Sequence, residues 1–183
     1  SGNEKQIRKY IENQIENYVD EIMVDSLGNL IARKKGNGNK IMIAAHMDQI
    51  GLMVTDIDDD GFLRFTNIGG ISPNITLSQQ VVFENGTIGV ISAEPIEDIG
   101  TNNKEETEKI VDIGDICVYK SDYNENDNVV FTKSLDDRVG CFVAIESIKQ
   151  IENNVNDLYF VFTVQEEVGL RGAKTVSYIA EPK

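Results

Sequence analysis

Three short polar clusters could carry chemistry, because each lies where a strongly apolar stretch of the sequence begins or ends. They occupy residues 45–49 (AHMDQ), 133–138 (KSLDDR) and 165–167 (QEE). The first and third follow apolar stretches, and the second precedes a stretch with helical periodicity. In open α/β sheets, ligand sites gather at the carboxyl ends of strands. We therefore expect the three clusters to meet at one edge of a sheet.

The first cluster holds the only histidine of the chain, His46, and an aspartate two residues later, Asp48. Imidazole combined with carboxylates suits Zn²⁺, Mn²⁺ or Co²⁺ better than Ca²⁺, so His46 is a candidate metal ligand. In an extended chain Asp48 lies on the same side as His46 and could accept the second ring N–H. From position alone, a purely structural role for the histidine stays open.

The other two clusters each contain two adjacent carboxylates. One carboxylate can bridge two metal ions, and another could take a proton from the bridging water, as in two-metal hydrolases. Ordinary roles also fit. Asp136 and Asp137 could cap a helix, and Glu166 and Glu167 could be solvated at a strand end. Adjacent carboxylates beside an apolar strand are costly if buried, unless a cation or hydrogen bonds balance them.

The sequence around the first cluster predicts the elements that position it. Apolar residues at helical spacing predict a helix within residues 4–20. Residues 21–25 and 29–33 are typical of the two strands of a hairpin. Residues 40–45 (KIMIAA) form a continuous apolar run, which predicts a strand buried on both faces directly before His46.

A second helix and strand separate the two later clusters. Residues 139–151 have apolar side chains at helical spacing, and residues 157–165 (DLYFVFTVQ) indicate a strongly apolar strand. Strand, helix and strand in this order form a crossover unit. We therefore predict an α/β fold in which the outer segments build one parallel-rich sheet with helices.

The middle of the chain has a different pattern. From about residue 51 to residue 120, short apolar runs are broken by Gly, Asn and Pro, which predicts a small all-β insert. Its acidic stretch, residues 97–111, could hold a short helix. We therefore predict an α/β catalytic domain made of residues 1–53 and 128–183, and an inserted β domain at residues 54–127.

Composition excludes several classes of partner. The 183 residues include 17 basic and 31 acidic side chains, a net charge of −14, so nucleic acid is not an expected partner. No apolar run approaches the roughly 20 residues of a membrane-spanning helix, so no membrane partner is expected. The two cysteines, Cys117 and Cys141, form no CxxC motif. We expect both to be buried thiols in a reducing, cytoplasmic compartment.

Together these motifs resemble the metallo-aminopeptidase family of glutamyl, deblocking and tetrahedral aminopeptidases, some of which carry the name endoglucanase M. The resemblance covers essentially the whole chain, and the order and spacing of its motifs match the family. It is carried by residues 44–54 (AAHMDQIGLMV), 61–70 (GFLRFTNIGG), 134–141 (SLDDRVGC) and 162–173 (FTVQEEVGLRGA).

The resemblance implies a peptide-hydrolysing enzyme with two zinc or cobalt ions. His46 would bind one metal, Asp136 would bridge both, and Glu167 would bind the other. Glu166 would be the general base that acts on the bridging water, and Asp48 would orient the imidazole. Asp137 and Arg138 would contact the metal-binding residues rather than the metal ions, and so hold those residues in place. If a C-terminal half is missing, it would leave a sheet edge and apolar surface exposed, so we expect self-association into a homo-oligomer or a complementing second chain.

Two departures from the family pattern have consequences. Gln49 stands where family members usually have Glu, which removes a charge but no expected ligand. The remaining aspartate and histidine ligands of the family would lie beyond Lys183, so we expect an incomplete fragment that binds metal weakly and has little or no peptidase activity. An alternative of another class is a binding or assembly module with a relic metal site. A glycoside hydrolase that uses Glu166 or Glu167 with Asp48 is disfavoured, because such enzymes use two opposed carboxylates and need neither His46 nor metal.

Overall fold

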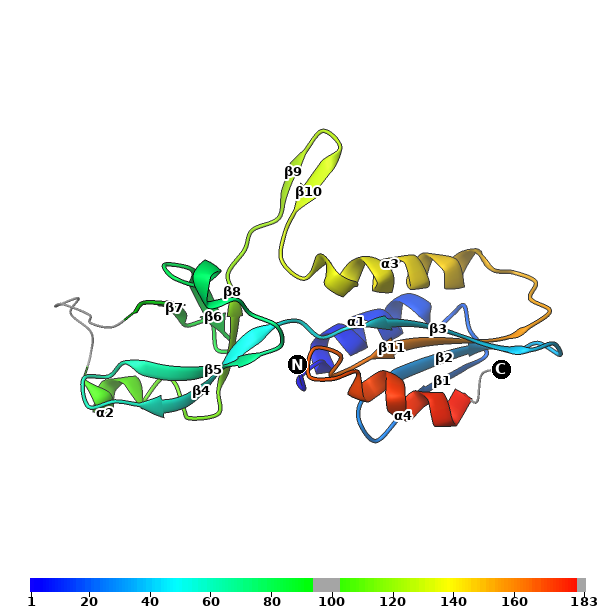
Figure 1. Cartoon of the computed structure of the whole chain (residues 1–183). Helices are drawn as coiled ribbons and strands as arrows, with labels where there is room; N and C mark the ends of the chain where they lie inside the picture. Colours follow the sequence, from blue (N-terminus) through cyan, green and yellow to red (C-terminus); the bar gives the residue numbers. More distant parts are fainter. Residues whose placement is uncertain (94–102, 181–183) are drawn as a thin grey trace. The chain divides into compact units, whose positions relative to one another are not determined.

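The structure, a computed structural model, describes residues 1–93 and 103–180. It forms two compact units, one made of Ser1–Gln49 and Ser134–Lys183 and the other of Ile50–Lys133. Figure 1 shows the course of the chain through both units. The predicted boundaries after residues 53 and 127 fall inside the second unit, and the assignment of a catalytic and an inserted domain stays a prediction.

The first unit is a four-stranded sheet with helices on both faces. Its strands are β1 (Glu21–Val24), β2 (Leu30–Lys34), β3 (Lys40–His46) and β11 (Asp157–Thr163), in the order β1-β2-β11-β3. The helices are α1 (Lys5–Ile15), α3 (Leu135–Gln150) and α4 (Arg171–Ala180). Side chains of α1 and α3 pack on one face of the sheet, and α4 packs on the other through Val176. The predicted α/β fold is confirmed, and each predicted element of this unit is present.

The prediction of a parallel-rich sheet is not confirmed for the described strands. Only β3 and β11 pair in parallel, whereas β2 pairs antiparallel with both β1 and β11. The turn between β1 and β2 is the physical reason for the first reversal. The Asp25 carboxylate accepts the N–H groups of Leu27, Gly28 and Asn29, and Gly28 has a φ of 107° that favours glycine.

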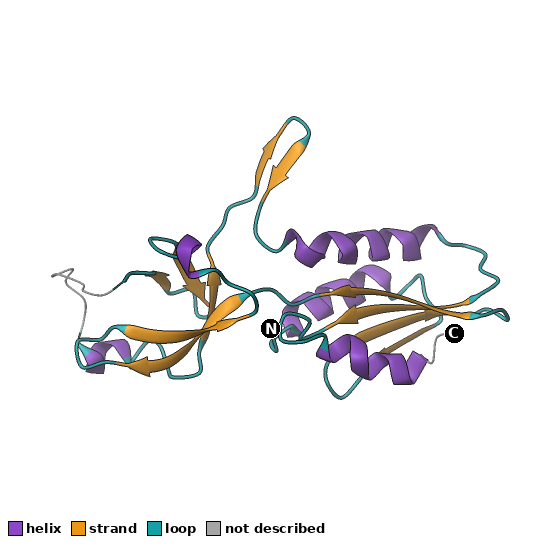
Figure 2. Cartoon of the chain, in the orientation of Figure 1, coloured by secondary structure: helices purple, strands orange, loops and turns teal. Residues whose placement is uncertain are grey.

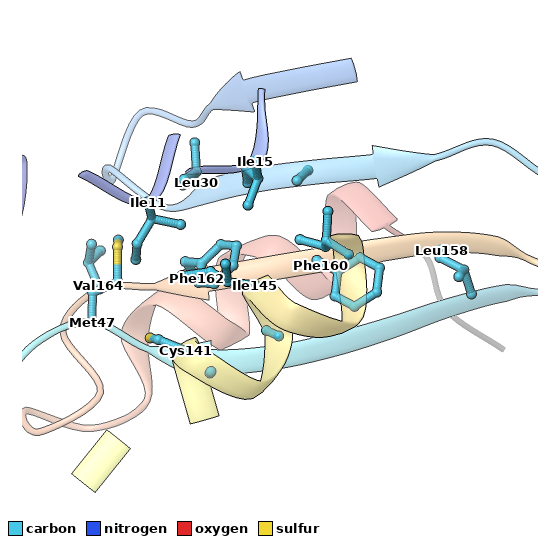
Figure 3. Close-up of a cluster of buried hydrophobic side chains, with 14 residues drawn as sticks. Ile11, Ile15, Leu30, Met47, Cys141, Ile145, Leu158, Phe160, Phe162 and Val164 are labelled. Atoms are coloured by element: carbon cyan, nitrogen blue, oxygen red, sulfur yellow. The ribbon is translucent and has the colours of Figure 1, made fainter. Parts of the chain in front are cut away.

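The core of the first unit lies between the sheet and the two helices α1 and α3. Phe160 and Phe162, from the central strand β11, are buried at its centre together with Ile11 and Ile15 of α1 (Figure 3). Every residue of β11 is buried, as its apolar sequence predicts. This central strand ends at Thr163, three residues before Glu166 of the Glu166–Glu167 pair.

The prediction that the strand before His46 is buried on both faces is wrong. In the described sheet β3 is an end strand that pairs only with β11, and Ile41 and Ile43 are 39% and 37% exposed. A continuous apolar sequence indicates that a strand is shielded from water on both faces. It does not indicate whether the elements that shield the strand belong to the described residues.

The second unit is built mainly of antiparallel strands (Figure 2). Its five-stranded sheet has the order β5-β4-β8-β6-β7, and a separate hairpin is formed by β9 and β10. The strands are β4 (Gly51–Ile57), β5 (Leu63–Ile68), β6 (Gln80–Phe83), β7 (Ile88–Val90), β8 (Ile116–Tyr119), β9 (Asn124–Asn126) and β10 (Val129–Phe131). Its own apolar core includes Leu52, Val54, Phe83 and Cys117.

The prediction of an all-β insert is not confirmed, because this unit also contains the short helix α2 (Lys104–Thr107) and a 3₁₀ turn, η1 (Pro73–Ile75). The helix lies within the acidic stretch 97–111, where a short helix was expected. Asn103 begins it by accepting the N–H of Glu106 on its side chain. Residues 97–102 of that stretch lie outside the described part of the chain.

Two further sequence expectations can be compared with the structure. Both cysteines are buried and free, as predicted. Among the residues that the structure describes, no helix combines the length and the apolar character needed to cross a bilayer.

An ion pair at the start of β11 provides a test of stability against pH. The Asp157 carboxylate accepts two hydrogen bonds of 2.8 Å from Arg33, which hold the pKa of Asp157 below its ordinary value of 3.8. A lowered pKa in the folded state adds stability above the ordinary pKa, and this stability is lost as pH falls through the folded pKa. Asp157→Asn should therefore lower the free energy of unfolding by about 2 kcal/mol at neutral pH and by clearly less near about pH 3.

Urea unfolding followed by circular dichroism at the two pH values measures this difference. Asp59→Ala, which changes an exposed aspartate, is the control. An equal loss of stability for Asp157→Asn at both pH values would contradict the assignment.

Candidate metal site

The three polar clusters meet at one edge of the first unit. β3 and β11 run in parallel with His46 opposite Thr163, so their carboxyl ends lie side by side. The His46 Nε2 atom is 3.1 Å from Asp136 Oδ1 and 3.7 Å from Glu166 Oε2. One ligand atom from each of His46, Glu166 and Glu167 lies within 4.8 Å of the others. A single imidazole is thus surrounded by carboxylates from three separate segments.

Asp48 connects two of these segments. Its carboxylate is fully buried and accepts the backbone N–H of Glu166 at 3.0 Å and that of Glu167 at 3.1 Å. The same carboxylate lies 3.5 Å from His46 Nδ1, while the backbone oxygen of Asp48 is nearer to that atom, at 3.2 Å. Asp48 therefore fixes the loop after β11 directly, and it contacts the imidazole through both its carboxylate and its carbonyl.

The two adjacent aspartates at the start of α3 have different surroundings. The Asp136 side chain is 91% exposed and contacts His46 Nε2. The Asp137 carboxylate instead accepts the backbone N–H groups of His46 at 3.2 Å and Gly140 at 3.0 Å. Both aspartates have non-helical backbone angles, so regular helix begins after Asp137. Asp137 therefore caps the helix, which leaves Asp136 facing the imidazole.

Gln49 contributes an amide at the rim of the site. Its Oε1 atom accepts a hydrogen bond from the Ser134 hydroxyl, two residues before Asp136. A neutral side chain at this position thus anchors the segment that carries the two aspartates, and it adds no negative charge to an already acidic cluster.

The electrostatics of the cluster favour a bound cation. Burial lowers the pKa of His46, but the hydrogen bond to Asp136 and the charges of Asp48 and Glu166 outweigh this effect and raise it. The pKa of Glu167 is raised first by burial and then by the neighbouring carboxylates, against the opposing effect of His46. Four carboxylates around one imidazole repel one another, and a divalent cation would relieve this repulsion. The donor set, imidazole nitrogen with carboxylate oxygens, suits zinc, manganese or cobalt better than calcium.

From the sequence, Cys141 is predicted only to be a buried thiol. In the structure it also makes a polar contact with the backbone of the site. Its Sγ atom lies 3.2 Å from the backbone oxygen of His46. The only sequence signal for this contact was the position of Cys141 on the same helical turn as Arg138 and Asp137, and this spacing alone does not identify a partner.

Comparison with solved structures shows the class of protein to which this fold and site belong. The aminopeptidase APDkam598 from the archaeon Desulfurococcus kamchatkensis matches with a TM-score of 0.90 and 39% identity, over 100% of this chain and 56% of that one. A TET aminopeptidase from a marine sediment archaeon, Thaumarchaeota archaeon SCGC AB-539-E09, matches with a TM-score of 0.91 and 34% identity, over 100% and 60%. The class is therefore that of the aminopeptidases.

The family model for M42 glutamyl aminopeptidase matches residues 28–97 and 94–183, and the chain belongs to this family. A putative aminopeptidase from Acetivibrio thermocellus is 49% identical in an alignment of 195 positions, gaps included, which covers 100% of this chain and 59% of that protein. Lysyl aminopeptidase from Pyrococcus furiosus is 36% identical in an alignment of 201 positions, which covers 97% of this chain and 58% of that protein. The predicted family is confirmed, and the chain spans less than two thirds of the length of these relatives.

Proposed function

We propose that this chain carries part of the active site of a metal-dependent aminopeptidase, which hydrolyses N-terminal residues from peptides. The observation that carries the proposal is the convergence of His46, Glu166 and Glu167, with ligand atoms within 4.8 Å, at the paired ends of β3 and β11. Membership of an aminopeptidase family supports the same chemistry. A glycoside hydrolase would use two of these carboxylates and an assembly module none, and neither would need the imidazole.

Each residue of the cluster has a role in this proposal. His46, Asp136 as a bridge, and Glu167 would hold two divalent ions, zinc or cobalt, which when bound polarise the scissile carbonyl and acidify water. The geometry supports Asp136 over Asp137 as the bridge, because the Asp137 carboxylate is occupied by two backbone N–H groups. Glu166 takes a proton from the attacking water on its carboxylate and returns it to the leaving amine. Asp48 holds the loop that carries Glu166 in place.

The substrate and the setting of the enzyme are part of the proposal. The substrate is a peptide with a free amino terminus, and the two free buried cysteines support a cytoplasmic location. Assembly into a homo-oligomer is supported by a relative, PhTET1-12s, which is described as a dodecamer and is 38% identical with a TM-score of 0.86. TET1 from Pyrococcus horikoshii is described as forming a tetrahedron or a large octahedral shell.

We further propose that the chain is only part of a complete catalytic domain. Its coverage of 59% and 58% of two relatives supports this interpretation, as do the exposed apolar residues on β3, the end strand of the described sheet. Three proposed protein ligands are few for two metal ions, because zinc sites normally use three or four ligands for each ion. The isolated chain is therefore expected to bind metal weakly and to have little peptidase activity.

A non-catalytic assembly module is the second candidate, and one observation favours it. The β9–β10 hairpin is exposed along its whole length and presents the apolar side chains of Val129, Val130 and Phe131 to solvent. Exposed apolar surface of this kind marks contact sites for partner proteins. In this case the His46 cluster would bind no metal.

The decisive test joins this chain to the segment that follows the matched region in the Acetivibrio thermocellus relative. The joined protein should release N-terminal residues from peptides, and a chelator or His46→Ala should abolish this release. N-acetylated peptides serve as the control substrate and should not be cleaved. In parallel, cobalt titration of the isolated 183-residue chain should show weak binding that His46→Ala removes. Chelator-resistant cleavage, or cobalt binding that is unchanged in His46→Ala, would refute the proposed function.

A further inference from the structure

Asp137 and the first helical turn that follows it in α3 make three polar contacts with the backbone of His46 and Met47. The Asp137 carboxylate accepts the His46 N–H at 3.2 Å, and the Cys141 thiol donates to the His46 carbonyl at 3.2 Å. The Arg138 Nε atom donates to the Met47 carbonyl at 3.0 Å. We name these three residues, Asp137, Arg138 and Cys141, the backbone clamp.

The position of His46 in the sheet explains why these contacts are needed. In a parallel ladder, alternate residues of a strand bond to the neighbouring strand. The Met47 N–H donates to Thr163 of β11 at 2.8 Å, so the polar backbone groups of His46 face the opposite side, where the described sheet has no further strand. Both His46 and Met47 are buried. A buried backbone group left unpaired there would lose its hydrogen bond to water without a replacement, which destabilises the fold.

The local structure of α3 is arranged around the clamp. The residue at position 140 is glycine, and a Cβ atom there would collide with the Asp137 carboxylate. This carboxylate also accepts the Gly140 N–H, which fixes it at the start of the helix. The Cys141 thiol is buried and forms no disulfide, so its S–H group can donate to the His46 carbonyl. Cys141 packs in the main core with Met47 (Figure 3).

We propose that Asp137, Arg138 and Cys141 are positioning residues that hold the backbone of His46 so that its imidazole faces the metal-binding carboxylates. They act through the main chain, since their hydrogen bonds reach the backbone of His46 and Met47. The proposal rests on the proposed function, because it assigns the clamp a purpose only if His46 binds metal. This positioning role depends on the polar atoms of the three side chains, whereas ordinary core packing would depend only on their volume.

The test compares variants that remove a polar atom with variants that keep it. Asp137→Ala removes the acceptor and Asp137→Asn retains one, while Cys141→Ala removes the donor and Cys141→Ser retains one. The first readout is hydrogen exchange of the His46 amide in the 183-residue chain. The second is cobalt affinity followed by visible absorption. Asp59→Ala, an exposed change in the other unit, is the control.

We expect Asp137→Ala to accelerate exchange of the His46 amide at least about tenfold and to weaken cobalt binding about 10- to 100-fold. Asp137→Asn and Cys141→Ser should recover part of each effect, which a loss of packing alone would not predict. Unchanged exchange and unchanged cobalt affinity in Asp137→Ala would overturn the proposal. If Asp137→Ala does not fold, the Cys141 pair decides, and equal values for Cys141→Ala and Cys141→Ser would overturn the role of the thiol. Absence of cobalt binding in the unaltered chain would count against the proposed function alone, because amide exchange still tests the clamp.

Discussion

Replacing Asp48 by alanine is expected to weaken cobalt binding about 10- to 100-fold and to lower the free energy of unfolding by about 2 kcal/mol. The Asp48 carboxylate is fully buried and accepts the N–H groups of both Glu166 and Glu167. Without it, the two N–H groups lose their partner, and the loop that carries the proposed base and ligand is released. Removal of the Asp48 charge also relieves its repulsion with the neighbouring carboxylates. The expected loss in the free energy of unfolding is therefore smaller than the sum for two hydrogen bonds to a charged group.

Asp48→Asn is the matched variant, because it keeps the shape of the side chain and one acceptor oxygen. It should retain more cobalt affinity than Asp48→Ala and should have a higher urea midpoint. Cobalt absorption and urea unfolding of the 183-residue chain measure the two effects separately. Cobalt affinity that is the same in Asp48→Ala and in the unaltered chain would show that Asp48 does not support the site.

Phe162→Ala should have the largest effect on stability, a loss of about 4 kcal/mol in the free energy of unfolding. Phe162 is completely buried in the core between the sheet and the helices α1 and α3 (Figure 3). It lies on β11, which is flanked by β2 and β3, so the surroundings cannot easily collapse into the space left by the ring. A loss of this size is comparable to the whole stability of a marginal domain.

Tyr178→Ala is the control for this prediction, because Tyr178 is an aromatic residue of the same unit that is 83% exposed. Its replacement should change stability by less than about 0.5 kcal/mol. Urea unfolding followed by circular dichroism compares the two variants. Similar losses for both would mean that the core between β11 and the helices does not dominate the stability of this unit.

The amino-acid sequence by itself determined the local elements and the meeting of the three polar clusters. The helical spacing in α1 and α3 is a local pattern, because burial of one helical face requires a period of about 3.6 residues. The apolar run in β11 is also local, because a strand buried on both faces needs apolar residues throughout. The convergence could also be predicted, since His46 and Glu166 each follow an apolar strand and parallel strands place their carboxyl ends together. The motifs were specific enough to identify the family.

Only the tertiary structure decided which partners each element meets. The direction of β2 relative to β11, the end position of β3 and the exposure of Ile41 depend on contacts between distant segments, which periodicity does not encode. The same holds for the different surroundings of Asp136 and Asp137, which are chemically identical neighbours. The backbone angles at the start of α3 turn one carboxylate toward the imidazole and the other toward the main chain of His46. A hydrogen bond needs a defined distance and direction, and only the folded chain supplies both.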